Sequence, residues 1–278
     1  MIVTKNIDSL QQELLKLSQA GKTVALVPTM GALHLGHSSL INKAKEIADA
    51  VVVSIFINPR QFSANEDFNK YPKNIDSDIE TAKSTGCDLI YAPDVEDMYS
   101  ENFATSINTG EMGKSLCGQF RDGHFDGVAT VVIKLLLRIM PHYAVFGMKD
   151  YQQLRIIERM VYDLDIPTEI ISAPTIRDDD GLALSSRNSY LSDDERKIAP
   201  LLYKKLCEVA KLVKDDSEKT EDILSDAIKE LSDSGFDVEY LKLCDAYSLE
   251  EIENWEENCR LFVAARLGST RLIDNIEV

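Results

Sequence analysis

Two histidines, one lysine and one arginine are the residues whose types and positions best suit phosphate chemistry. His34 and His37 stand in the segment HLGH, shortly after an apolar run, and Lys149 and Arg187 lie further along the chain. An imidazole can donate to a phosphate oxygen and stabilise the charge that develops as a phosphoanhydride breaks. An arginine offers a fixed fork of donors, and a lysine offers a compact positive charge. These side chains predict a site that holds phosphate groups.

His34 and His37 lie where a strand, a turn and a helix are expected. Residues 23–27 are apolar and β-branched, which predicts a buried parallel strand, and Pro28 is expected to end its ladder because it has no N–H. Gly31 and Gly36 allow a tight turn that approaches a ligand closely. From Ser38 the apolar residues follow a helical period. The N-terminus of a helix is a favourable place for phosphate.

Two other interpretations of this segment stay open. His34 and His37 share a face of the helix, so they could simply be half-exposed histidines that cap it. Gly31, Gly36, His37 and Ser38 also fit a Walker A loop, except that His37 replaces the lysine that reaches the phosphates. The missing lysine makes the Walker interpretation the weaker one.

The HxGH pattern instead resembles the signature of the nucleotidyltransferase superfamily, which includes the class I aminoacyl-tRNA synthetases. This resemblance implies attack on the α-phosphate of ATP, release of pyrophosphate, and a second phosphate-binding motif downstream. Residues 181–188, GLALSSRN, stand where that motif is expected. Ser185, Ser186 and Arg187 supply hydroxyl and guanidinium donors.

Polar residues also follow two other expected strands. Gln61 comes after the strand expected at 50–57, and Gln153 comes after the one expected at 143–147. In open α/β sheets, ligands bind outside the carboxyl ends of the strands. An amide both donates and accepts, so two glutamines there suit a ligand with hydroxyl and carboxylate groups. Asp150 is expected either to accept from a ribose hydroxyl or to cap the following helix.

Strands and helices alternate through the first part of the chain, which predicts an α/β fold with a doubly wound, mostly parallel sheet. After Pro174 the pattern changes to two charged helices and then strands, which predicts a smaller α+β domain. We expect domains at residues 1–175 and 176–278. The helices of the second domain are predicted at 192–212 and 217–234, and its strands at 237–245, 260–267 and 271–278.

Composition limits the partners. The 278 residues carry a net charge of −17, which argues against a nucleic-acid or anionic membrane surface but not against a local basic pocket. The five cysteines have no metal-ligand spacing, which is typical of core thiols in a reducing cytoplasm. The N-terminus does not resemble a signal peptide, and the apolar runs are too short to cross a bilayer.

Taken together, the motifs closely resemble one family, the pantothenate synthetases or pantoate–β-alanine ligases. The similarity runs in the family's order through nearly the whole chain. The matching segments are PTMGALHLGH (28–37), FINPRQF (56–62), YPK (71–73), LCGQFRDGHFDGV (116–128), FGMKDYQQ (146–153), PTIRDDDGLALSSRN (174–188) and AARLGSTRLIDN (264–275).

The resemblance implies a two-step reaction. The carboxylate of (R)-pantoate attacks the α-phosphate of ATP to give pantoyl adenylate and pyrophosphate, and β-alanine then displaces AMP to give pantothenate. It also implies a cytoplasmic, Mg²⁺-dependent homodimer in coenzyme A biosynthesis. In such an enzyme a Rossmann-like N-terminal domain binds ATP and pantoate, and a smaller C-terminal domain closes over ATP as a lid. No nucleic acid or membrane partner is expected.

The same resemblance assigns the site residues. His37 is the expected proton donor, and His34, Lys149 and Arg187 are expected to offset the repulsion between two anions. Gln61 is expected to hold pantoate and lie beside β-alanine, Gln153 to hold pantoate, and Asp78 to lie near magnesium. The residues expected to line the ATP site are Met30, Gly31, Ala32, Leu33, His34, Leu35, Gly36, His37, Gly147, Met148, Lys149, Asp150, Ile176, Leu184, Ser185, Ser186 and Arg187.

Two positions depart from the family. Most relatives have an acidic residue where this chain has Met148. Many have proline where this chain has Asp122, and the absence of that proline is expected to loosen the loop at 118–127. Two alternative functions stay open: another HxGH adenylyltransferase, which would lack the segments at 56–62 and 149–153, and an inactive nucleotide sensor, which would lack the catalytic side chains.

Overall fold

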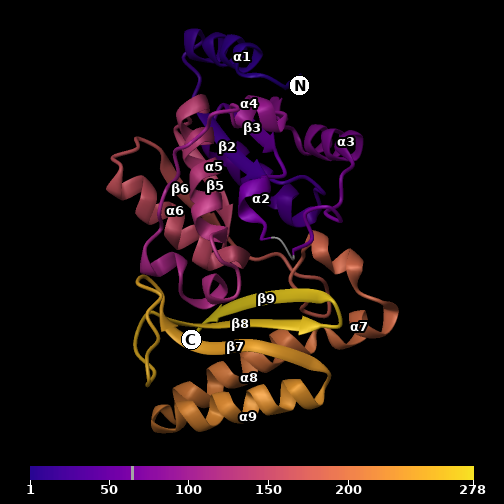
Figure 1. The fold of residues 1–278 in the computed structure, drawn as a ribbon, viewed down its shortest axis with the longest axis vertical. Helices are drawn as coiled ribbons and strands as arrows, with labels where there is room; N and C mark the ends of the chain where they lie inside the picture. Colours follow the sequence, from indigo (N-terminus) through magenta and orange to yellow (C-terminus); the bar gives the residue numbers. More distant parts are fainter. Residues whose placement is uncertain (64–65) are drawn as a thin grey trace. The chain divides into compact units, whose positions relative to one another are not determined.

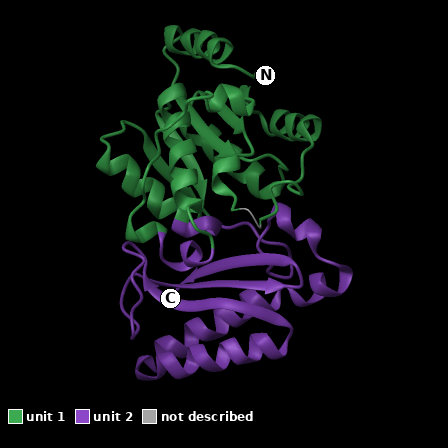
Figure 2. Cartoon of the chain, in the orientation of Figure 1, with its two compact units in different colours: residues 1–113, 121–148, 153–174 green, residues 114–120, 149–152, 175–278 purple. Residues whose placement is uncertain are grey.

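The computed structural model describes residues 1–63 and 66–278, which divide into two compact units (Figure 2). The first unit contains residues 1–113, 121–148 and 153–174, and the second contains residues 114–120, 149–152 and 175–278. Two short segments, 114–120 and 149–152, thus group with the second unit although they precede residue 175 in the chain. The expected division at residue 175 places both in the first domain.

The first unit is built on a six-stranded sheet in which every pairing is parallel (Figure 1). Its order is β1-β4-β3-β2-β5-β6. The expected α/β class is confirmed, and the sheet includes β1, which is only three residues long and shows no sequence pattern of its own. The strands are β1 Ile2–Thr4, β2 Val24–Thr29, β3 Ala50–Ile55, β4 Leu89–Tyr91, β5 Tyr143–Gly147 and β6 Glu169–Ala173.

Helices connect these strands on two faces of the sheet. From β2 the chain moves through β3 to β4 in one direction, and later through β5 to β6 in the other, so right-handed crossovers place the two sets of helices on opposite faces. Accordingly α2 packs against α3, and α5 packs against α1. The helices are α1 Ile7–Gln19, α2 Leu35–Ile47, α3 Ile75–Thr85, α4 Val95–Met98, α5 His124–Ile139 and α6 Tyr151–Asp163.

The sheet's central strands are buried on both faces, as their apolar sequences predict. All six residues of β3 are buried, as are five of the six in β2. The expectation that Pro28 ends the ladder is wrong. Pro28 pairs with Ser54, and the carbonyl of Thr29 still accepts from the N–H of Phe56 at 3.0 Å. Proline removes one donor but keeps an extended backbone and its own carbonyl, so pairing with β3 continues.

The second unit consists of a three-stranded antiparallel sheet, ordered β7-β8-β9, against which α8 and α9 pack (Figure 1). The strands β7 Phe236–Asp245, β8 Cys259–Leu267 and β9 Thr270–Glu277 lie close to the predicted ranges. The helix predicted at 192–212 is two helices, α7 Asp193–Ile198 and α8 Leu201–Asp215, because Pro200 interrupts it. The last helix, α9, spans Thr220–Asp233.

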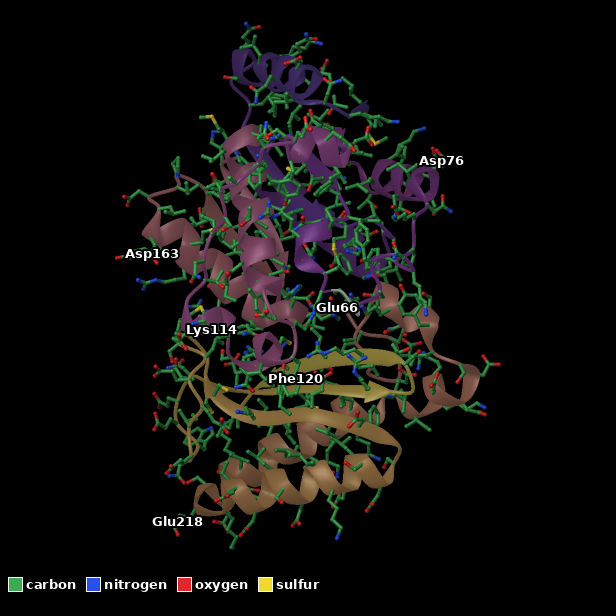
Figure 3. The ribbon with its side chains drawn as sticks, in the orientation of Figure 1. Glu66, Asp76, Lys114, Phe120, Asp163 and Glu218 are labelled. Atoms are coloured by element: carbon green, nitrogen blue, oxygen red, sulfur yellow. The ribbon has the colours of Figure 1, made fainter. Side chains whose placement is uncertain are left out.

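The surface carries the acidic excess, and the cysteines lie mostly inside. Asp76, Asp163 and Glu218 are exposed, and their side chains point away from the ribbon (Figure 3). All five cysteines are free thiols and four of them are buried. Among the described residues, no helix combines the length and the apolar character needed to cross a membrane.

Candidate active site

The centre of the first unit's site is the turn between β2 and α2. Two successive residues have left-handed backbones there, Gly31 with φ of 85° and Ala32 with φ of 51°. A side chain at Gly31 would come within 2.8 Å of the carboxylate of Asp78. That carboxylate accepts from the N–H groups of Ala32 at 3.0 Å and Leu33 at 2.7 Å. Asp78 therefore holds an energetically unfavourable turn in place from a helix that begins far along the chain.

His34 and His37 close the N-terminus of α2 as a reciprocal cap. Nδ1 of His34 accepts from the N–H of Gly36 at 3.1 Å, and Nδ1 of His37 accepts from the N–H of His34 at 3.3 Å. The two ring centroids are 4.2 Å apart. A ring nitrogen that accepts carries no proton, so both imidazoles are neutral with the proton on Nε2. The two histidines thus cap α2, as one interpretation of the sequence expects. The same hydrogen bonds orient the Nε2–H donors of both rings.

Gln61 is fixed on the neighbouring strand end, in the 3₁₀ turn Pro59–Gln61 that follows β3. Its side chain is buried, and its Oε1 accepts from Nδ2 of Asn58 at 3.1 Å while its Nε2 donates to Sδ of Met30 at 3.0 Å. Asn58 also donates to the carbonyl of Gly127 at 3.0 Å. From the sequence Asn58 is only a turn residue, and its role as an anchor depends on a partner in α5 that no local pattern reveals.

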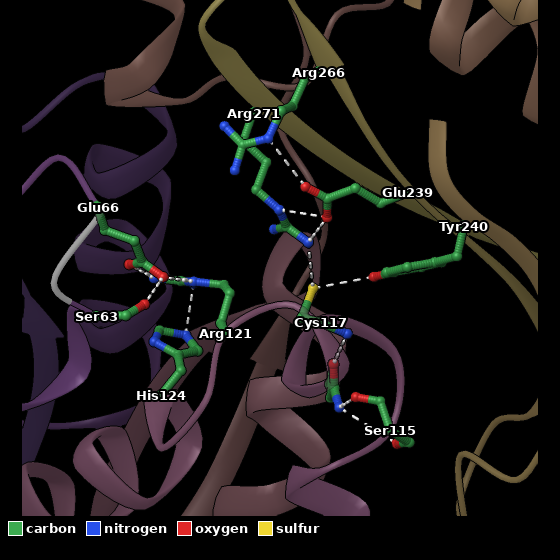
Figure 4. A network of polar contacts seen from close by, with 11 residues as sticks. Ser63, Glu66, Ser115, Cys117, Arg121, His124, Glu239, Tyr240, Arg266 and Arg271 are labelled. Atoms are coloured by element: carbon green, nitrogen blue, oxygen red, sulfur yellow. Dashed lines mark hydrogen bonds and ion pairs between the residues drawn. The ribbon is translucent and has the colours of Figure 1, made fainter. Parts of the chain in front are cut away.

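A chain of polar contacts runs from Gln61 through His124 and Arg121 to Glu66, and Figure 4 shows its part from His124 to Glu66. Nδ1 of His124 lies 2.7 Å from the carbonyl oxygen of Gln61, and its Nε2 lies 2.8 Å from Nη1 of Arg121. Arg121 also donates to both carboxylate oxygens of Glu66, at 2.8 and 2.6 Å. Burial favours the neutral form of Glu66, but the hydrogen bonds and charge of Arg121 prevail and hold the pKa of that carboxyl at about 2.

Gln153 and Gly147 lie on the β5 side of the central strand β2, opposite the β3 side that carries Gln61. Gly147 ends β5, and Gln153 lies half-buried in the first turns of α6. Because β2 lies between β3 and β5, the strand ends that precede Gln61 and Gln153 flank the histidine turn. Neighbouring strands are about 4.8 Å apart, so the three strand ends span roughly 10 Å, the scale of a small hydroxy acid with its attached phosphate.

The second unit holds Lys149 and Asp150 against its C-terminal strand. Nζ of Lys149 lies 3.5 Å from Oδ1 of Asp150. Nδ2 of Asn275, in β9, donates to the carbonyl of Lys149 at 3.0 Å, and Oδ1 of Asn275 accepts from the buried Arg260 at 2.7 Å. The guanidinium of Arg260 lies over the ring of Tyr151, 4.1 Å from its centroid. The backbone that carries Lys149 is thereby fixed to the sheet.

The downstream phosphate motif lies on a small hairpin in the same unit. The N–H of Leu184 donates to the carbonyl of Ile176 at 2.9 Å, so these two expected ATP residues are paired. Arg177 donates to both oxygens of the buried Asp274 at 2.6 and 2.8 Å, which fastens the hairpin to β9. Ser185 caps the 3₁₀ turn Ser186–Tyr190 by accepting from the N–H of Arg187 at 3.2 Å.

The expected site residues therefore form two groups. The first unit contains the turn at 30–37 together with Gln61, Asp78, Gly147, Met148 and Gln153. The second contains Lys149, Asp150, Ile176 and the segment 184–187. Within the described residues, no group of three or more His, Cys, Asp or Glu side chains is arranged to hold a metal ion. The magnesium role expected for Asp78 stays a prediction.

Comparison with known proteins decides the family. The family model described as pantoate–β-alanine ligase matches residues 2–277. The chain belongs to the pantoate–β-alanine ligase family. A pantothenate synthetase of Paramagnetospirillum magneticum is 47% identical over 277 residues, which cover 99% of this chain and 97% of that protein.

Solved structures agree with this ligase assignment. The pantothenate synthetase of Thermus thermophilus superposes with a TM-score of 0.93 at 40% identity, covering 100% of this chain and 99% of that one. The pantoate–β-alanine ligase of Francisella tularensis, solved with β,γ-ATP and β-alanine, gives a TM-score of 0.84 at 35% identity and covers 100% and 97%. This chain is therefore an enzyme that joins pantoate to β-alanine to form pantothenate.

Proposed function

We propose that this ligase uses ATP and works through a pantoyl adenylate. The observation that supports this route best is the cap of α2, which directs two Nε2–H donors from neutral histidines at the end of the central strand. A carboxylate oxygen of pantoate attacks the α-phosphorus of ATP, and the bond to the β-phosphate oxygen breaks to release pyrophosphate. Histidine N–H donors and the positive end of the helix stabilise the charge that develops on the leaving phosphates.

The cationic side chains of the second unit serve the same step. Lys149 exchanges its contact with Asp150 for a phosphate oxygen, and Arg187, Ser185 and Ser186 supply further donors at a turn that Ser185 already caps. Asp150 accepts from a ribose hydroxyl. Without such positive charge, the attack of one anion on another is strongly opposed. Ser185, Ser186 and Arg187 belong to the domain formed by residues 176–278, which acts as a lid over ATP.

In the second step the amine of β-alanine attacks the acyl carbon of the adenylate. The C–N bond forms, the bond between the acyl carbon and the phosphate oxygen breaks, and AMP leaves as the amine loses a proton. Gln61 holds pantoate and lies beside β-alanine, and Gln153 holds the pantoate from the other side of β2. Because an acyl adenylate is already activated, this step depends mainly on positioning.

In this scheme Mg²⁺ binds together with ATP, through the phosphates of the nucleotide. Mg²⁺ prefers oxygen ligands and is commonly bound through substrate phosphates and water with one or two carboxylates, so a dedicated protein cage is not required. When bound, it would reduce the negative charge of the phosphates. Asp78 is the carboxylate that we propose near it, in addition to its contacts with the N–H groups of Ala32 and Leu33.

We further propose a cytoplasmic homodimer. Strand β6 is an edge of the sheet, and Tyr162 and Leu164 at the end of α6 expose apolar surface close to it in sequence. A second copy of the chain would cover such a surface. Light scattering coupled to size-exclusion chromatography gives the mass directly, and a monomer at micromolar concentration would contradict the proposal.

The reaction route is tested by separating the half-reactions. With ATP, Mg²⁺ and pantoate alone, the enzyme should release pyrophosphate in a single turnover and retain pantoyl adenylate. Addition of β-alanine should then release AMP and pantothenate in equal amounts. AMP release that requires β-alanine but shows no prior pyrophosphate burst would contradict the adenylate route. Formation of a dinucleotide would instead favour the alternative adenylyltransferase.

A further inference from the structure

The first turn of α5 makes close contacts with the 3₁₀ turn that carries Gln61. Gly127 packs so closely that a side chain there would come within 2.1 Å of the carbonyl oxygen of Arg60. The carbonyl of Gly127 accepts from Asn58, and His124 contacts the carbonyl of Gln61. The backbone position of Gln61 therefore depends on residues far later in the chain.

The partners of His124 determine its protonation. A carbonyl oxygen only accepts, so Nδ1 of His124 carries a proton and donates to Gln61 across 2.7 Å. A guanidinium only donates, so Nε2 accepts from Arg121 across 2.8 Å. His124 is thus a neutral imidazole in one tautomer, the opposite of the tautomer in His34 and His37.

Glu66 completes the chain by fixing Arg121. Its two carboxylate oxygens accept from Nε and Nη2 of the guanidinium, and its Oε1 also accepts from the hydroxyl of Ser63 at 2.8 Å. The side chains of Arg121 and Glu66 are 13% and 17% exposed, and His124 is 8% exposed, so water competes little with these bonds. A guanidinium fixed on two sides leaves Nη1 directed at the imidazole.

We propose that Glu66, Arg121 and His124 form a relay of positioning residues that fixes Gln61 for pantoate. The relay rests on the proposed role of Gln61. Each member acts on the next through a directed hydrogen bond, and none needs to touch substrate. Its loss should raise the pantoate requirement while leaving the ATP requirement near its original value, because the histidine turn has its own support from Asp78.

The sharpest test is a matched pair of substitutions at His124. His124→Asn places an amide N–H near the position of Nδ1 and should keep the donation to Gln61. His124→Gln places its amide nearer the position of Nε2 and should lose it. We expect the KM for pantoate to rise about tenfold in His124→Gln, the scale of one buried hydrogen bond, and to rise less in His124→Asn, which keeps the donation to Gln61 and loses only the acceptor for Arg121. Equal effects of the two substitutions would overturn the relay.

A double-mutant cycle separates positioning from direct substrate contact. Once Gln61→Ala has removed the side chain, His124→Gln should add little further loss for pantoate, because nothing remains to be positioned. Additive losses would overturn the relay and indicate that His124 meets substrate itself. Glu66→Gln, which keeps the shape of the side chain but weakens the contact with Arg121, should raise the KM for pantoate in the same direction.

Further measurements separate a failure of the relay from misfolding and from a wrong role for Gln61. Thermal unfolding of each variant should show a native transition, and the ATP requirement serves as the internal reference. If Gln61→Ala itself leaves the pantoate requirement unchanged, the proposed role of Gln61 fails and the relay fails with it. If Gln61→Ala raises that requirement but the His124 pair behaves alike, only the relay fails.

Discussion

The backbone N–H of His34 donates to Nδ1 of His37 across 3.3 Å, which leaves the proton of the His37 ring on Nε2. This single bond makes the end of α2 a directed donor. The same ring is both a helix cap and the expected proton donor, so the structural and chemical interpretations of HxGH describe one arrangement. Substitutions that separate the two nitrogens can therefore separate the two roles.

We predict that His37→Ala slows adenylate formation by roughly 10²–10⁴-fold. His37→Gln, whose amide reaches toward the Nε2 position, should retain more activity than His37→Asn, whose amide lies near Nδ1 and mainly serves the cap. Pantoate-dependent pyrophosphate release measures both. A variant with His37→Ala that keeps full release would show that His37 takes no part in the chemistry.

Asp78 should be more important for the fold of the turn than for the metal. Asp78→Ala leaves two partly buried N–H groups without their carboxylate partner, so we expect the free energy of unfolding to fall by about 1–3 kcal/mol. Denaturant unfolding measures this loss. Titration of activity with Mg²⁺ tests the other role: a strong rise in the required Mg²⁺ concentration without loss of stability would assign Asp78 to the metal instead.

Lys149 should act in the first half-reaction only. We predict that Lys149→Ala cuts pyrophosphate release by about 10²-fold or more, since it removes a positive charge from the phosphates. Synthetic pantoyl adenylate should still react with β-alanine at a comparable rate. Equal losses in both half-reactions would mean that Lys149 supports the structure near Asn275 rather than the phosphates. Asn275→Ala is the matched variant, because it removes the bond to the Lys149 carbonyl and keeps the charge.

Gln153 should distinguish charge from hydrogen bonding in the pantoate site. Gln153→Glu adds a negative charge beside an anionic substrate and should raise the KM for pantoate far more than the KM for ATP. Gln153→Ala only removes hydrogen bonds and should do less harm. Steady-state titration of each substrate decides between them. An equal effect of the two substitutions would refute the charge argument, and an effect on ATP alone would place Gln153 in the nucleotide site.

The ion pair between Glu66 and Arg121 should make the stability of the fold depend on pH in acid. Its folded-state pKa is depressed from 4.5 to about 2, so the ionised pair with Arg121 stabilises the fold above pH 4.5, and this contribution is lost as the pH falls from 4.5 toward 2. We expect this contribution to be about 1 kcal/mol, the upper end of what ion pairs near a protein surface usually provide. Glu66→Gln should be less stable than the parent at neutral pH, and the difference should shrink at pH 3. The exposed Asp163→Asn is the control, and a difference that does not depend on pH would contradict the ionic origin.

Sequence patterns predicted most of the elements because those patterns are local. The apolar run of β3, the periodicity of α2 and the strands β7 to β9 each show in a short window, and the motifs together identified the family. The same windows failed at Pro28, where pairing with β3 continues, at Pro200, where one predicted helix is two, and at β1, which is too short to show a pattern.

Residue types and motif order predict which residues carry the chemistry: the HxGH histidines, Lys149, Arg187 and the two glutamines. How these side chains are held depends on contacts between distant segments that appear only in the folded chain. Asp78 meets Leu33 across 45 positions of sequence, and His124 meets Gln61 across 63. Such contacts arise when parallel strands and their crossover helices bring distant segments to one sheet edge. A hydrogen bond requires an angle and a distance of about 3 Å, and residue order alone specifies neither.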